Sequence, residues 1–128
     1  MTTDDLLDLA HALGVTVTTH HGGPKGWYEH HTKTISIRAD LRAANQRCTL
    51  AHEIAHAIAG DTYTGITHFD QRMERAADMT AAQMLIANDT YARAEQLHGP
   101  HPGAIARELG VTVHIIETWQ KMTERTPA

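Results

Sequence analysis

Two histidines four positions apart, with a glutamate directly after the first, constrain the fold of this chain more than any other feature. They form the motif His52-Glu53-x-x-His56 in a chain of 128 residues that contains 11 histidines, so the pattern alone is weak evidence. Residues four apart lie one above the other on an α-helix, so both imidazoles can reach one Zn²⁺ while Glu53 stands beside the attacking water. The motif therefore predicts a helix carrying the core of a zinc hydrolase site, which also needs a third protein ligand.

The residues around the motif favour such a helix. Segment 47–59 contains no Pro or Gly and is rich in Ala, Leu and Ile. Asp40 is a candidate N-cap, and Gly60 is a candidate residue for the turn that ends the helix. We expect a cleft face with Cys48, His52, His56 and Ala59, and a core face with Leu50, Ile54, Ala57 and Ile58.

A second helical segment supplies the missing ligand. Residues 70–86 have small and apolar side chains throughout and no helix breaker, which places Glu74 and Asp78 one turn apart on one face. We predict that Glu74 is the third metal ligand. Asp78 would then accept a hydrogen bond from the second ring nitrogen of a ligating histidine and fix the orientation of that ring.

Other third ligands are less well placed. A longer motif of the metzincin type would need Gly and His where this chain has Ala59 and Thr62. Asp61, His68 and Asp70 remain alternatives, and His68 ranks second to Glu74. None of the three has a regular element around it as good as that of Glu74, and ligands on loops are held less firmly than ligands on helices.

The upstream sequence predicts a short helix and a small sheet. Residues Asp4 to Leu13 have the spacing of an amphipathic helix that ends at Gly14, and residues 15–19 alternate as a strand does. Residues 27–38 are typical of a β-hairpin that turns near 31–33, with Ile35 and Ile37 facing inward. We therefore expect an α+β fold: a three-stranded sheet with a hairpin, packed against a zinc-binding helix pair and followed by C-terminal helices.

A single domain, 1–128, fits the length, with a catalytic core at 1–98 and a helical pair at 103–122 packed on it. Residues 90–98 have weaker helical character, residues 99–103 break the chain, and the last two helices meet at Gly110. This pair is similar to a helix-turn-helix. A DNA reader displays Arg, Lys, Gln or Asn on its second helix, whereas this one offers Val113, His114, Glu117 and Thr118, so we expect packing.

Composition excludes several classes of protein. The formal charge is −4 and the basic residues are scattered, which argues against direct binding of nucleic acid. No apolar segment approaches the roughly 20 residues that span a bilayer. Cys48 is the single cysteine, so no intrachain disulfide can form, and it is expected to be a small buried apolar residue. The first residues lack the pattern of a signal peptide, which predicts a cytoplasmic protein.

Two blocks of this sequence resemble the ImmA/IrrE family of small zinc metallopeptidases. They are residues 47–60, which include the motif, and residues 74–86, with a hairpin-like segment upstream; together they span roughly positions 26 to 86. The resemblance implies that Zn²⁺ is bound by His52, His56 and Glu74, with Glu53 as catalytic base.

The chain departs from the family pattern at two positions near the third ligand. Members pair the helix Glu with a second Glu two residues on and carry an aromatic residue after the Asp or Asn, where this chain has Ala76 and Thr80. Neither position is a proposed ligand, so the departures concern packing and leave the chemistry intact.

The resemblance also implies a function. Family members cleave, or promote the loss of, helix-turn-helix repressors in phage, mobile-element or stress regulons, so we expect a regulatory zinc endopeptidase with a protein substrate. Two rival hypotheses are a DNA- or repressor-binding module with a structural or vestigial zinc site, and a zinc hydrolase acting on a non-peptide bond. The donor to the developing oxyanion stays open among Tyr28, His30, His31, Tyr63 and His68.

Overall fold

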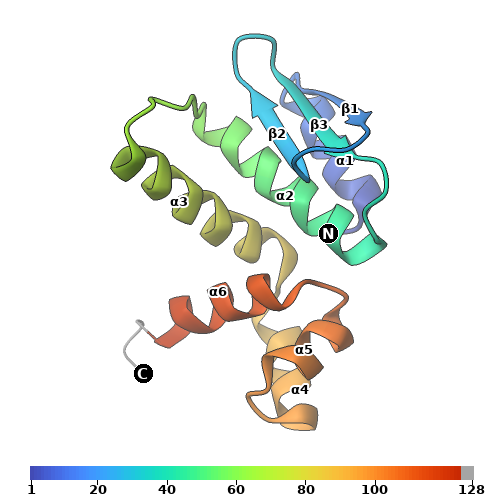
Figure 1. Ribbon diagram of the computed structural model, residues 1–128. Coiled ribbons are helices and arrows are strands. Elements are labelled where there is room, and N and C mark those ends of the chain that lie inside the picture. Colours follow the sequence, from blue (N-terminus) through green and yellow to red (C-terminus); the bar gives the residue numbers. More distant parts are fainter. Residues whose placement is uncertain (125–128) are drawn as a thin grey trace.

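The computed structural model describes residues 1–124, which form a small mixed sheet and six helices. In chain order these elements are α1 (Thr3–Ala12), β1 (Thr16–His20), β2 (Gly26–Glu29), β3 (Thr34–Arg38), α2 (Ala43–Ala59), α3 (Thr67–Leu85), α4 (Asn88–His98), α5 (Pro102–Leu109) and α6 (Val113–Glu124). Figure 1 shows the sheet and α1 at one end, the pair α2 and α3 in the middle, and α4 to α6 at the other end. The predicted α+β class is confirmed.

The sheet has the order β1-β3-β2, with β1 parallel to β3 and β2 antiparallel to β3. The predicted hairpin is β2 and β3, joined by a turn at 30–33 in which Lys33 has a φ of 49°. The loop 21–25 carries the chain from one edge of the sheet to the other. Gly22 and Gly23 both have a φ of 70° there, a conformation that residues with a side chain rarely adopt.

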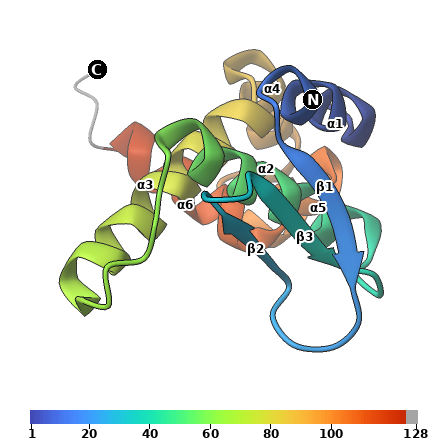
Figure 2. The same cartoon turned by 90° about the horizontal axis from the view of Figure 1, so that it is seen from above.

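One face of the sheet packs on α2 (Figure 2). Ile35 and Ile37 of the central strand are buried there, as the alternation predicts. The approach is close at the start of β2, because a Cβ atom on Gly26 would lie 2.8 Å from the methyl group of Thr49 on α2. The sheet therefore forms a wall directly beside the motif helix.

Helix α2 follows the prediction with two corrections. It ends at Gly60 in the left-handed conformation, as expected. Asp40 is not its N-cap: Arg42 holds that position without a side-chain hydrogen bond, and Asp40 instead pairs with Arg38 at 2.7 Å. Ile58 was expected on the core face but is 53% exposed; it lies in the last turn of α2, just before the helix ends at Gly60.

Helix α3 packs alongside α2 and brings Glu74 and Asp78 close to the His52–His56 motif. It begins at Thr67 rather than at Asp70. Asp70 accepts hydrogen bonds from the backbone N–H groups of Thr64 and Gly65, so it stabilises the loop that leads into the helix. Small buried residues on α3, among them Ala77 and Ala81, allow the two helices to approach closely.

The last three helices bring the chain back to α3. Helix α4 begins at Asn88 rather than at Thr90, and α5 and α6 meet at Gly110, which has the left-handed conformation expected of a helix end. Helix α6 packs on α3 as well as on α5 and buries Ile115, Ile116 and Trp119. Within the described residues, no helix combines the length and apolar character needed to cross a membrane.

Candidate metal centre

Three side chains predicted to bind metal converge between α2 and α3. The Nε2 atoms of His52 and His56 lie 3.1 Å apart. The carboxylate of Glu74 lies 2.9 Å from Nε2 of His52 through one oxygen and 3.1 Å from Nε2 of His56 through the other. One ligand atom from each residue can be chosen so that all lie within 4.8 Å of one another. The helix spacing thus brings two imidazole nitrogens and one carboxylate to a single point.

The donor set fits a small divalent cation. Tetrahedral coordination with Zn–N bonds of about 2.0–2.1 Å places two ligand atoms roughly 3.3 Å apart. The two Nε2 atoms lie 3.1 Å apart, slightly closer than this spacing, and they lie 2.9 and 3.1 Å from different oxygens of Glu74. Two imidazole nitrogens and a carboxylate also suit Zn²⁺ chemically.

The other nitrogen of each histidine is held by a separate carboxylate. Nδ1 of His52 lies 2.8 Å from Asp78 on α3, and Nδ1 of His56 lies 2.8 Å from Asp61 in the loop after α2. Because a carboxylate accepts and does not donate, each Nδ1 carries a proton, which leaves Nε2 as the ring nitrogen that can bind a cation once it is deprotonated. Asp78 therefore stands where the sequence predicted, and Asp61, considered as a ligand, instead supports one.

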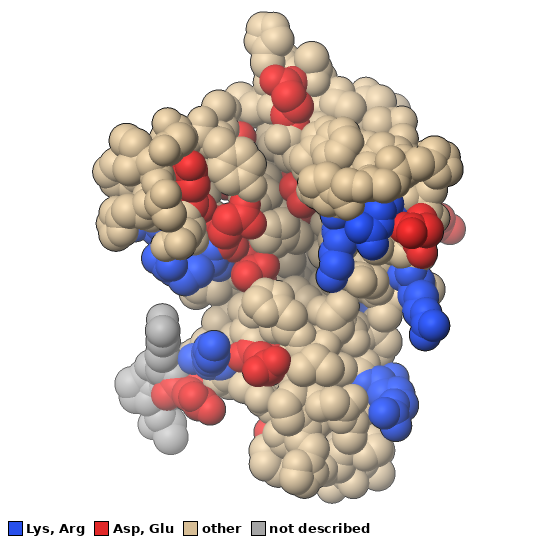
Figure 3. All heavy atoms as spheres, in the orientation of Figure 1, with Lys and Arg blue, Asp and Glu red and all other residues tan. Residues whose placement is uncertain are grey.

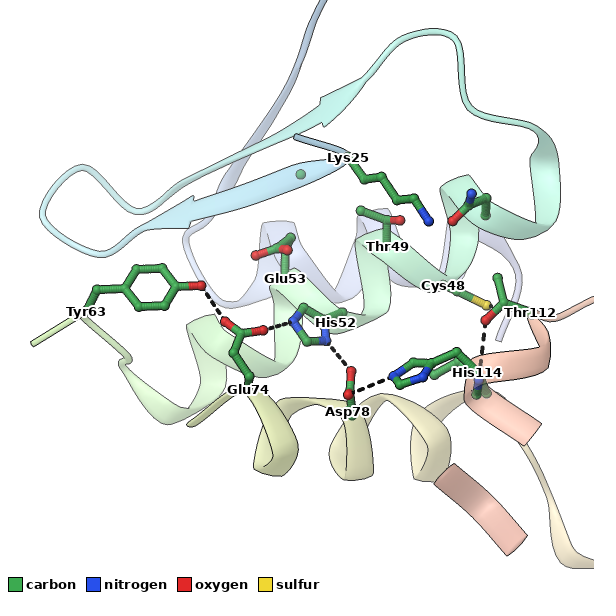
Figure 4. A pocket seen from close by; sticks show the side chains of 13 residues that line it. Lys25, Cys48, Thr49, His52, Glu53, Tyr63, Glu74, Asp78, Thr112 and His114 are labelled. Carbon is green, nitrogen blue, oxygen red and sulfur yellow. Dashed lines mark hydrogen bonds and ion pairs between the residues drawn. The ribbon is translucent and has the colours of Figure 1, made fainter. Parts of the chain in front are cut away.

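Glu53 lies beside this centre on α2 and points toward the sheet side of the cleft (Figure 4). It is 6% exposed. Burial raises the pKa of its carboxyl, and Glu74 adds to that, while His52 and His56 act in the opposite direction. A raised pKa suits a carboxylate that must take up a proton and release it again.

The charged groups of the centre shift one another's pKa values toward the ionised forms. Burial alone would lower the pKa of His52, but the hydrogen bond to Asp78 and the charges of Glu53, Asp78 and Glu74 outweigh it and raise that pKa to about 9 in the absence of metal. For Glu74, burial opposes ionisation, yet the hydrogen bond from Tyr63 and the two histidines hold the pKa below its ordinary value. The carboxylates thus form a negative site suited to a cation.

A cleft of about 430 Å³ opens onto these groups. Acidic side chains gather around the hollow on the face shown in Figure 3. Its walls come from the start of β2, from α2 and α3, and from the first turn of α6; they comprise Lys25, Gly26, Asn45, Cys48, Thr49, His52, Glu53, Tyr63, Glu74, Asp78, Thr112, His114 and Ile115. The cleft is thus shared by segments from both ends of the chain.

Of the candidate oxyanion donors, Tyr63 is the one that contacts a proposed ligand. Its hydroxyl donates a hydrogen bond to Oε1 of Glu74, and the ring lines the cleft. Burial, followed by the hydrogen bond to Glu74, raises the pKa of Tyr63, so the hydroxyl keeps its proton.

Tyr28 lines a small pocket together with Glu53, His56 and Tyr63, and the three histidine candidates have their contacts elsewhere. His68 is in the first turn of α3, where it pairs with Arg72 at 2.7 Å. His30 shares a hydrogen bond of 2.8 Å with the hydroxyl of Tyr28, and His31 is exposed in the hairpin turn. Cys48 is buried at 5% exposure, as expected, and accepts a hydrogen bond from the backbone of Thr112.

Sequence reasoning did not assign His114 to the site. It stands in the first turn of α6, lines the cleft, and places Nε2 2.8 Å from Oδ2 of Asp78. No local pattern marks it, because its partner lies 36 positions earlier in the chain and the contact depends on how α6 packs on α3.

The fold and the geometry agree with the comparison to known families. A family model described as the IrrE N-terminal-like domain, of the peptidase M78 group, matches residues 7–118. The chain therefore belongs to this family, a class of metallopeptidase-type domains, and the resemblance seen in the sequence is confirmed.

A solved structure shows the same fold in a larger protein. It is described as a Mycobacterium tuberculosis transcriptional regulator, is 18% identical, and aligns with a TM-score of 0.64 over 93% of this chain and 41% of that one. The present chain thus spans about two fifths of the regulator's length. A search of curated protein sequences finds no match.

Proposed function

We propose that this protein is a zinc-dependent endopeptidase with a regulatory role. The observation that carries the proposal is the convergence of His52, His56 and Glu74 on one point, with Glu53 buried beside it in a cleft. Membership of the peptidase M78 group supports the same reaction class. Of the ions this donor set suits, Zn²⁺ is the one most often bound by two histidines and a glutamate at a hydrolytic site.

Each side chain has a role in that reaction. The chemistry that a divalent cation supplies at such a site is activation of water and polarisation of the scissile carbonyl. Glu53 accepts the proton of the attacking water at its carboxylate and passes it to the leaving amine. Asp61 and Asp78 keep the two imidazoles oriented, and Tyr63 supplies a hydroxyl that can donate a hydrogen bond to the developing oxyanion once substrate is bound.

The edge strand beside the cleft favours a polypeptide substrate. Strand β2 is an edge strand of the sheet, and its first residue, Gly26, lines the cleft. The unpaired backbone groups of an edge strand can hydrogen-bond an extended peptide. An extended segment laid along β2 would cross Glu53 and the metal centre.

Within that class, we propose a helix-turn-helix repressor of a phage, mobile element or stress regulon as the substrate. The support is the family resemblance and the description of the structural neighbour as a transcriptional regulator. Such a substrate acts in the cytoplasm, where we place this protein. We further propose that 1–98 is the catalytic core, on which 103–122 packs and completes the cleft.

The experiment is an incubation of the zinc-loaded protein with the repressor encoded by a neighbouring gene, followed by mass spectrometry of the products. The protein with Glu53→Gln is the matched control, because the change keeps the side chain's size and removes its basicity. Cleavage by the wild type at a defined bond, absent with the control, supports the proposal. An intact repressor, together with a salt-sensitive complex between this protein and operator DNA, would favour the binding-module hypothesis.

A further inference from the structure

The carboxylate that orients His52 is itself held from a second direction. Asp78 uses Oδ1 for Nδ1 of His52 and Oδ2 for Nε2 of His114, each at 2.8 Å. Both imidazoles act as donors, since the carboxylate can only accept. A carboxylate held by one hydrogen bond can still rotate about its last side-chain bond, and a second donor on the other oxygen fixes its plane.

The position of His114 is set by the core. Its neighbours Ile115 and Ile116 are almost fully buried, as is Trp119 further along α6. The start of the helix is tied down as well, because the backbone N–H of Thr112 donates to the sulfur of Cys48 on α2 at 3.4 Å. Packing that orders α6 therefore also aims His114 at Asp78.

The side chain of His114 contributes little to that packing. It is 69% exposed, and it faces the cleft, where Figure 4 shows it at the end of a row that runs through Asp78, His52 and Glu74 to Tyr63. Truncating an exposed side chain leaves the buried residues of α6 in place. Packing of α6 therefore does not require a histidine at this position. The hydrogen bond to Asp78 does explain one.

We propose that His114 is a positioning residue of the metal centre: by fixing Asp78 it orients the ring of His52, and it thereby couples helix α6 to the strength with which the site holds its cation. The inference rests on the metal site of the proposed function and not on the identity of the substrate. It means that a partner or ligand that displaces the first turn of α6 weakens metal binding at a distance.

The test measures metal binding directly. Metal-free protein is titrated with Zn²⁺ in competition with a chromophoric chelator, and the visible absorption of the Co²⁺-substituted protein is recorded as a report on ligand geometry. The variants are His114→Ala, which removes the donor, and His114→Gln, whose amide can still donate to Asp78. Lys121→Ala is the matched control, since it truncates another exposed polar side chain on the same helix.

We expect His114→Ala to weaken Zn²⁺ affinity by about 3- to 10-fold, less than the roughly 10- to 100-fold loss seen when a ligand's own partner is removed. The Co²⁺ bands should shift in the same variant. His114→Gln should restore most of the affinity, and Lys121→Ala should match the wild type. Circular dichroism and urea unfolding establish that each variant is folded.

A double-mutant cycle tests whether His114 acts through Asp78. If it does, His114→Ala has no further effect on Zn²⁺ affinity in a protein that already carries Asp78→Ala. Wild-type affinity and an unchanged Co²⁺ spectrum in His114→Ala, or full additivity in the cycle, would overturn the coupling alone. Failure of the wild-type protein to bind Zn²⁺ at all would overturn the proposed metal site and this inference together.

Discussion

The two histidines of the motif are supported from different parts of the molecule. His56 is 5% exposed, and its Nδ1 is held by Asp61, which follows in the loop directly after the same helix. His52 is more exposed, and its support comes from Asp78 on α3 and through it from His114 on α6. One half of the site is therefore built locally, whereas the other half depends on the packing of distant helices.

The two kinds of support differ in whether a partner could alter metal binding through them. Local support forms together with α2 and offers little for a partner to act on. Support from α3 and α6 exists only when both helices are in place, so it can respond to events at the C-terminal end of the described chain.

The largest effect should come from a change that touches neither support. Glu53→Gln removes the proton acceptor, so we expect cleavage to fall by about 10²- to 10⁴-fold, the usual contribution of general acid–base catalysis. Zinc content, measured by elemental analysis, should stay equal to that of the wild type, because both histidines keep their carboxylate partners. A Glu53→Gln protein with full activity would remove Glu53 from the reaction.

The next effect should come from the carboxylate that both histidines share. Glu74→Ala removes a direct ligand and should weaken Zn²⁺ affinity by more than about 100-fold, beyond the range for the loss of a ligand's partner. The control is Glu117→Ala, an exposed carboxylate on α6. Unchanged zinc stoichiometry in Glu74→Ala under dilute conditions would exclude Glu74 from the centre.

Removing the carboxylate partner of one histidine at a time should then distinguish the two histidines. Asp61→Asn and Asp78→Asn should each weaken Zn²⁺ affinity by about 10- to 100-fold. Only Asp78→Asn should also speed hydrogen exchange in the first turn of α6, because it disturbs the acceptor that holds His114 there. Equal exchange rates in the two variants would mean that the long-range support does not constrain α6.

The smallest effect should come from a cap remote from the centre. Thr2 and Asp5 form a reciprocal capping box at the start of α1, so Thr2→Ala should lower the free energy of unfolding by about 1 kcal/mol and leave Zn²⁺ affinity unchanged.

The same cap predicts a dependence on pH. The hydrogen bond from the Thr2 backbone holds the pKa of Asp5 below its ordinary 3.8. Its contribution to stability is therefore present above that value and is lost as the pH falls through the lowered pKa. Asp5→Ala should consequently cost stability at about pH 6 and less at about pH 2, as measured by urea unfolding.

The sequence sufficed for the elements whose signals are local. The spacing of the motif and the absence of helix breakers predicted α2. A spacing of one turn predicted that Glu74 and Asp78 share a face of the next helix, and the close approach of Glu74 to both histidines agrees with that prediction. Gly60 and Gly110 marked helix ends because a left-handed residue is required there. The hairpin followed from alternation and its polar turn.

What the sequence could not supply depends on contacts between distant segments. Parallel pairing of β1 with β3 and the return of α6 to α3 are set by the core as a whole, so the assignments of His114 and Thr112 to the cleft were missed. Asp61 stayed open as an alternative third ligand, and only the structure shows that it faces Nδ1 of His56. Ile58 was expected inside because periodicity gives the side of a helix and not which of its turns other elements cover.

The central claim is that three side chains from two helices hold one cation beside Glu53. Its most direct test is a crystal structure of the zinc-loaded protein, with anomalous diffraction recorded on both sides of the zinc absorption edge. We expect one ion about 2.0–2.2 Å from Nε2 of His52, Nε2 of His56 and the carboxylate of Glu74. An ion bound elsewhere, or bound here with the carboxylate of Glu74 turned away, would contradict it.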